Sequence, residues 1–264
     1  MSPARLAAWG IGIAMAASAS AQPIVVVYAA GSLRSPMSAI AADFERAQGQ
    51  PVRLVFGASG LLRDRIVAGE PADVLASANM EHPEALVARG WAASVVPFAR
   101  NELCALAQPR VGLDSANVLT AMLDPRWKLG TSTPKADPSG DYAWEVFRRA
   151  DTLRPGAYAT LSTKARQLTG GPQAPAPPAD KSVYGVLVAG GEADIFLTYC
   201  TNAKQAVAEE PSLVAVSMPA ELRVGAVYGL AARHDASAVA RSFAAYVVSP
   251  AGQRTLAQYG FAPP

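Results

Sequence analysis

Apolar runs alternate with amphipathic segments through the first hundred residues. The β-branched run at 24–28 (IVVVY) is typical of a strand buried on both faces. After a turn of small residues, apolar side chains recur at i, i+3, i+4 and i+7 from Met37, which indicates one face of a helix. The alternation continues with predicted strands at 52–56 and 73–76 and a helix at 61–68. Strand, turn and helix in repetition predict a parallel, doubly wound α/β sheet.

The rest of the chain continues this alternation without an internal sequence repeat. Predicted strands lie at 103–107, 128–131, 195–199, 213–217 and 224–231, and predicted helices at 139–150, 182–189, 238–248 and 250–259. Residues 169–179 (TGGPQAPAPPA) are rich in glycine and proline, which predicts an irregular surface loop rather than a domain linker. We therefore expect a second α/β unit to begin near residue 103.

The first 21 residues predict a secretory signal peptide. Arg5 provides a short basic start, residues 6–17 contain no charged side chain, and Ala19-Ser20-Ala21 fits the small-x-small rule for cleavage. The apolar run is too short to span a bilayer. We therefore expect cleavage before Gln22 and a periplasmic mature protein.

Composition excludes several classes of function. The 23 Lys and Arg against 21 Asp and Glu leave a net charge of +2, so no nucleic-acid partner is expected. Two cysteines and two histidines exclude a multi-cysteine zinc site and a site with three histidines. His82 and His234 lie in segments that we predict to be at the surface. After export, Cys104 and Cys200 can form a lasting disulfide, and two small buried thiols are the alternative.

Three turns of small residues carry the candidate chemistry. Residues 30–32 (AGS) and 57–60 (GASG) each follow a strand and precede a helix, and 138–140 (PSG) precedes a helix in the second unit. Such turns present backbone N–H groups and the positive end of a helix dipole, and their serines add hydroxyl donors: Ser32, Ser59 and Ser139. Plain helix capping explains each serine on its own. Tyr199 ends a predicted strand and offers a phenol donor, or is a tyrosine at the edge of the core.

A site made only of donors selects its anion. A fully deprotonated tetrahedral dianion carries acceptors only, whereas phosphate at neutral pH carries a proton that needs an acceptor. A buried polar group without a hydrogen-bond partner costs about 1–3 kcal/mol of binding free energy. A site without a carboxylate to accept this proton therefore rejects phosphate. The three turns themselves contain no Asp or Glu, and we expect the nearby Asp137 and Asp141 to point away.

An exported hydrolase using Ser32 or Ser59 is the alternative from another class. It would need a base and an orienting acid, and no histidine lies near either turn in the sequence. The flanking residues also miss the G-x-S-x-G pattern. We therefore expect a binding protein and not an enzyme.

Three stretches carry a resemblance to a known family. They are "VVVYAAGSLRSPMSAIAADFERAQGQPVRLVFGASGLLRDRIVAGEPADVLASAN" at 25–79, "GEADIFLTYCTNA" at 191–203 and "SPAGQRTLAQYGFAPP" at 249–264. In this order they resemble the periplasmic molybdate/tungstate-binding proteins of ABC importers. The resemblance covers most of the mature chain and is weakest across 153–179.

The resemblance implies a type II periplasmic binding-protein fold with two lobes, each a doubly wound mixed sheet flanked by helices. Lobe one would be 22–102 plus 225–264, and lobe two 103–224. The family's ligand-binding positions fall on five residues of this sequence: Ser32, Ser59, Ser139, Lys181 and Tyr199.

The implied ligand is molybdate or tungstate, held between the lobes without a further cofactor or metal. The implied partner is the membrane permease of an ABC importer, and the protein is expected to be a monomer. A binding protein for another small anion such as sulfate, or for ferric iron, stays open as an alternative.

Overall fold

The computed structural model describes residues 24–175 and 181–264. The predicted signal peptide at 1–21 and most of the proline-rich part of the predicted loop, 176–179, lie outside the described residues. The strands are β1 Val25–Ala30, β2 Val52–Gly57, β3 Val74–Ser77, β4 Val96–Ala107, β5 Leu129–Ser132, β6 Arg166–Thr169, β7 Ile195–Tyr199, β8 Val214–Ser217 and β9 Gly225–Ala232.

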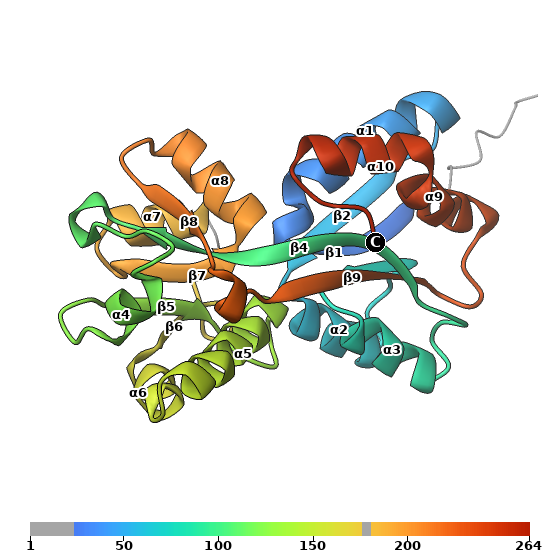
Figure 1. Cartoon of the computed structure of the whole chain (residues 1–264). Coiled ribbons are helices and arrows are strands. Elements are labelled where there is room, and N and C mark those ends of the chain that lie inside the picture. The colour runs from blue at the N-terminus through green and yellow to red at the C-terminus, as the bar shows by residue number, and fades with distance from the viewer. Residues whose placement is uncertain (1–23, 176–180) are drawn as a thin grey trace, which may run out of the picture.

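Helices flank these strands in both halves of the molecule (Figure 1). The α-helices are α1 Arg34–Gln48, α2 Ser59–Val67, α3 Glu81–Ala88, α4 Val118–Leu123, α5 Pro138–Leu153, α6 Ala157–Lys164, α7 Val183–Ala189, α8 Cys200–Glu209, α9 Ala238–Val248 and α10 Pro250–Gln258. Short 3-10 helices are η1 Gly31–Leu33, η2 Pro109–Val111 and η3 Ala220–Leu222. No helix in the described ranges is long and apolar enough to cross a membrane.

The strands follow the order β2-β1-β3-β9-β4-β7-β5-β6, with β8 on β4. Pairing is parallel for β1 with β2 and β3 and for β5 with β6 and β7, and antiparallel where β9 joins β3. Each half is therefore a mixed sheet between helices, which confirms the predicted α/β, two-lobed fold class.

Two long strands, β4 and β9, run between the halves (Figure 1). Residues 96–102 of β4 pair with β9, whereas residues 103–107 pair with β7 and β8. The division of the chain into lobes at 102/103 and 224/225 stays a prediction, and it falls on these two strands.

Each half buries the apolar residues that the sequence pattern assigned to its core. The predicted helix face of α1 is buried, and the ring of Phe44 packs edge-on against Phe243 of α9, with centroids 5.3 Å apart. All of β7 is buried in the other half, beside Phe147 of α5. The parallel β1 and β2 end side by side, with Ala30 opposite Gly57, so the turns at 30–32 and 57–60 lie at the same edge of the sheet.

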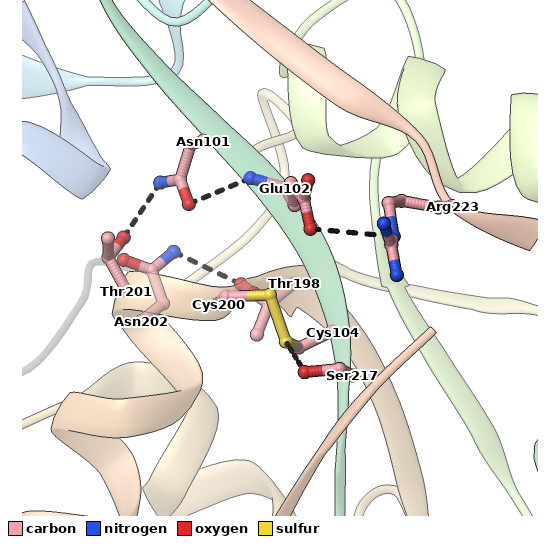
Figure 2. The surroundings of a disulfide bond; sticks show 9 residues. All are labelled: Asn101, Glu102, Cys104, Thr198, Cys200, Thr201, Asn202, Ser217 and Arg223. Carbon is pink, nitrogen blue, oxygen red and sulfur yellow. Dashed lines mark hydrogen bonds and ion pairs between the residues drawn. A yellow bond between two sulfur atoms is a disulfide. The ribbon is translucent and has the colours of Figure 1, made fainter. Parts of the chain in front are cut away.

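A disulfide joins Cys104 in β4 to Cys200, the first residue of α8 (Figure 2). The disulfide alternative is therefore confirmed. Next to it, Asn101 Nδ2 donates a hydrogen bond to Thr201 Oγ1 over 2.8 Å (Figure 2). These links hold the start of α8, directly after Tyr199, against the strand that crosses between the halves.

Candidate functional site

A cavity of about 270 Å³ lies between the two halves. The first half contributes residues of η1, the end of β2 and the start of α2. The second half contributes the residue before α5, the segment after β6, residues 181–184 around the start of α7, the end of β7, and α8. Four of the five predicted ligand residues line it: Ser32, Ser59, Lys181 and Tyr199.

The two serines of the first half lie at the ends of parallel strands. Ser32 follows β1 within η1, and its Oγ lies 2.9 Å from Oη of Tyr228 in β9. Ser59 is the first residue of α2 and is 1% exposed, and its Oγ accepts the N–H of Ala78 over 3.1 Å. Because the N-terminus of α2 also faces the cavity, this wall combines hydroxyls with the positive end of a helix.

Tyr199 approaches the same place from the second half. Its Oη donates to the carbonyl oxygen of Ala78 over 3.4 Å, so Tyr199 and Ser59 bond to the two backbone groups of one residue. Burial raises the pKa of the Tyr199 phenol well above its usual value. The phenol therefore stays neutral and remains a hydrogen-bond donor at physiological pH.

Lys181 also lines the cavity and is exposed. It precedes Ser182, whose Oγ accepts the N–H of Gly185 over 3.4 Å and so caps α7. Val183 and Tyr184 at the start of α7 line the cavity as well. The resemblance assigned one ligand-binding position to Lys181, and all four residues from 181 to 184 line the cavity.

Ser139 is the predicted residue that the structure does not bring to the cavity. Its side chain is fully buried, and its Oγ donates to Oγ of Ser132 over 2.8 Å. Ser132 in turn lies 2.8 Å from Oγ1 of Thr169. Of the described residues in this turn, Asp137 lines the cavity instead of Ser139.

The expectation that Asp137 points away is wrong. Asp137 is the N-cap of α5, and its Oδ1 accepts the N–H of Ser139 over 3.0 Å. This bond turns the carboxylate back towards the helix N-terminus, and Asp137 itself lines the cavity. Burial raises the pKa of Asp137 to about 6, against the lowering effects of that N–H and of the Ser132 hydroxyl. Asp141 does not line the cavity, and its Oδ1 accepts the N–H of Lys135 over 2.8 Å.

The arginines after the two serine turns have different positions. Arg34 lines the cavity, and its guanidinium lies over the ring of Phe56, 4.7 Å from the centroid. Arg63 instead pairs with Asp64 at 2.6 Å and lies 3.1 Å from Nδ1 of His82. Arg34 therefore places a positive charge at the cavity, whereas Arg63 does not.

The expectation that His82 lies at the surface is wrong. Its side chain is 2% exposed, because the start of α3 packs into the first half of the molecule. Burial, together with the charge of Arg63, lowers the pKa of His82. His82 is therefore a buried, neutral residue that supports α2 and α3, and His234 is exposed as expected.

A direct backbone contact joins the two halves beside the cavity. The N–H of Gly60, at the start of α2, donates to the carbonyl oxygen of Ala136 over 2.9 Å. A Cβ at position 60 would lie 2.5 Å from the oxygen of Lys135 and 2.7 Å from that of Ala136. Only glycine therefore lets the halves approach this closely.

The sequence prediction missed several residues that line the cavity: Asp137, Gly170, Gly171, Tyr184, Asn202 and Gln205. The sequence Asp-Pro-Ser is typical of the start of a helix, so Asp137 could have been predicted as the N-cap of α5. Gly170 and Gly171 belong to the segment that glycine and proline content marked only as a loop. Asn202 and Gln205 lie on α8, a helix that the sequence did not predict.

Comparison with known proteins identifies the family. The family model described as "Bacterial extracellular solute-binding protein" matches residues 25–262. The chain belongs to this family. An uncharacterized Pasteurella multocida protein, PM1146, is 35% identical over 238 residues, which is 90% of this chain and 98% of that protein.

Proteins similar to this chain include molybdate-binding proteins. The Escherichia coli molybdate-binding protein ModA is 28% identical over 90% of this chain and 88% of its own length. The solved periplasmic molybdate-binding protein of Azotobacter vinelandii superimposes with a TM-score of 0.72 at 21% identity, over 91% of this chain and 99% of that one. The resemblance to periplasmic molybdate-binding proteins is thus confirmed.

The same fold also occurs in a protein for another anion. The sulfate-binding protein SubI of Mycobacterium tuberculosis superimposes with a TM-score of 0.73 at 18% identity, over 91% of this chain and 86% of that one. At such identities the likeness shows the fold alone. The relatives therefore support a role in solute binding, and the ligand has to be argued from the cavity.

Proposed function

We propose that this protein is the periplasmic solute-binding component of an ABC importer and captures molybdate or tungstate in the cavity between its lobes. The observation that carries this proposal is the convergence of Ser32 and Ser59 from one half with Tyr199 from the other on a single cavity. Neutral donors from opposite sides can surround an anion only when the halves are together. Binding would therefore favour the closed form.

The donors at the cavity suit an oxyanion in both charge and hydrogen bonding. The hydroxyls and the N-terminus of α2 supply directed donors, and Arg34 and Lys181 supply positive charge at the lining. Strands β4 and β9 connect the halves and would carry the hinge of an opening motion. A monomer that docks on a membrane permease completes the proposed role.

The volume of the cavity favours a second candidate, an oxyanion that carries an organic substituent. A cavity needs roughly 10–15 Å³ to hold a single water molecule. The cavity of about 270 Å³ is therefore larger than one small oxyanion requires. Phe56, Leu61 and Val183 offer apolar wall for the remainder. A phosphomonoester would place its phosphoryl group at the serines and its carbon chain against this wall.

Isothermal titration of the mature protein distinguishes these ligands. We expect molybdate or tungstate to bind with micromolar or tighter affinity, and glycerol phosphate, sulfate and ferric iron serve as competing ligands. Each lost donor costs about 1–3 kcal/mol, so Ser32→Ala with Ser59→Ala should weaken binding at least about tenfold.

The control is Ser237→Ala, which removes the N-cap of α9, far from the cavity. It should lower stability by about 1 kcal/mol and leave affinity unchanged. Binding of glycerol phosphate without molybdate or tungstate would replace the first candidate by the second. Folded protein that gives no heat with any oxyanion would reject both.

A further inference from the structure

Among the described residues that line the cavity, Asp137 is the one carboxylate. Ser32, Ser59 and Tyr199 offer hydroxyl groups and Lys181 an ammonium, whereas an ionised Asp137 can only accept hydrogen bonds. A fully deprotonated oxyanion also carries acceptors only. An ionised Asp137 and such a ligand would therefore repel each other inside a cavity that both share.

The two oxygens of Asp137 have different surroundings. Oδ1 accepts the N–H of Ser139 over 3.0 Å and is thereby occupied as the cap of α5. Oδ2 lies against Gly170, where an added Cβ would come within 2.5 Å of it, and Gly170 also lines the cavity. We assign contact with a ligand or a proton to Oδ2, because it lies beside Gly170, which lines the cavity, and does not hold the cap of α5.

Among the residues that the structure describes, the titratable groups that face Asp137 do not neutralise its charge. Tyr184 of α7 and Tyr199 of β7 lie close enough for the charge of Asp137 to raise their pKa, and both phenols stay neutral. Asp141, one turn along α5, carries a like charge. Arg34 and Lys181 line the same cavity, but neither forms an ion pair with Asp137 in the structure.

We propose that Asp137 is a specificity-determining residue that shares one proton with the bound oxyanion. This inference rests on the proposed function of the same cavity. A protonated oxyanion, such as hydrogen phosphate or a singly protonated phosphomonoester, brings its own proton and donates it to the Asp137 carboxylate. A proton-free dianion, such as molybdate or sulfate, binds together with one proton taken from solvent onto Asp137, which then donates to the ligand.

The proton balance of each case gives a measurable difference. For molybdate, uptake should rise from nearly zero at about pH 5 to about one proton at about pH 8, because the pKa of free Asp137 is about 6. Its affinity should fall up to about tenfold per pH unit above that pKa. Hydrogen phosphate should bind at about pH 8 without this uptake.

Titration calorimetry in two buffers of different ionisation enthalpy counts these protons on the wild-type protein. The companion variant is Asp137→Asn, whose amide oxygen can still cap the Ser139 N–H, so that its NH₂ group faces the cavity. We expect this variant to lose the proton uptake, to bind molybdate up to about a hundredfold more tightly at about pH 8, and to bind phosphate at least about tenfold more weakly.

Asp141→Asn is the matched control, since it removes a neighbouring carboxylate that does not line the cavity. It should keep the proton uptake. Molybdate binding without proton uptake at any pH, unchanged in Asp137→Asn, would overturn this inference and leave the proposed function standing. A folded wild-type protein that binds no oxyanion would overturn both.

Discussion

The two walls of the cavity are built in different ways. In the first half, Ser32 and Ser59 sit in equivalent turns after the adjacent parallel strands β1 and β2, so each is placed by residues near it in the sequence. In the second half, the wall combines Asp137, the segment after β6, the start of α7 and Tyr199. The first wall is local in origin and carries hydroxyl donors and the charge of Arg34, whereas the second depends on distant contacts and carries a carboxylate.

The largest expected effect concerns the disulfide that holds the second wall. Cys104→Ser with Cys200→Ser opens a link between residues 96 positions apart, which should lower the free energy of unfolding by about 2–5 kcal/mol. Because Cys200 follows Tyr199, hydrogen exchange should increase around β7 and α8 and stay unchanged around β1 and α2. Equal increases in both halves would contradict the difference between the walls.

The pH dependence of stability tests the carboxylate of the second wall. The pKa of Asp137 in the folded protein is about 6, above the usual value of 3.8, so its contribution to stability is fully present below about pH 3.8 and is lost as pH rises through about 6. Asp137→Asn should therefore raise the free energy of unfolding of the ligand-free protein by up to about 3 kcal/mol at about pH 8.

The same substitution should change the free energy of unfolding little at about pH 4. Urea unfolding at the two pH values measures the difference. A gain of equal size at both would show that the effect comes from capping α5 rather than from the buried charge.

The contact between the walls can be broken from the first half alone. Gly60→Ala places a methyl group against the carbonyl oxygens of Lys135 and Ala136, so the halves should close incompletely. We expect affinity for the oxyanion to fall about ten- to a hundredfold, with little loss of stability, since position 60 has an ordinary helical backbone. Small-angle scattering with ligand should show a more open molecule.

Ser237→Ala is the control for that variant, because it removes only the cap of α9 and touches neither the contact with Ala136 nor the strands that would carry the hinge. It should close and bind as the wild type does. A Gly60→Ala protein with wild-type affinity would show that the contact with Ala136 plays no part in ligand capture.

The smallest expected effect belongs to the exposed cation of the second wall. Lys181→Ala should weaken binding only a few-fold, because an exposed charge is screened by water and salt. The loss should shrink further as ionic strength rises, as titrations at low and high salt would show. A loss that persists at high salt would mean instead that Lys181 donates directly to the ligand.

The sequence predicted the bounds of some elements without error and missed other elements. The strand at 195–199 and the helix at 238–248 match β7 and α9, because each has one consistent periodicity. The helix α8 was missed, since it starts directly after β7 without any turn residue. The first half of β4 was missed because Pro97, Arg100 and Glu102 interrupt its apolar pattern.

The candidate site divides in the same way. Ser32 and Ser59 were predictable because a strand end and a helix start together fix their position. Position 139 was assigned by resemblance, but here the Ser139 hydroxyl bonds to Ser132 in the interior while Asp137 lines the cavity. Which of two residues in one turn faces the cavity depends on the helix capping bond and on Gly170, which lies some thirty positions away.

The sequence by itself determined the α/β alternation, the serine turns of the first half and the family, because periodicity, turn chemistry and motifs are properties of neighbouring residues. Only the tertiary structure decided that Cys104 and Cys200 are bonded, that Gly60 meets Ala136, and that a carboxylate lines the cavity. These features arise from contacts between segments that are far apart in the chain, and the burial that raises the pKa of Asp137 exists only once those segments have packed.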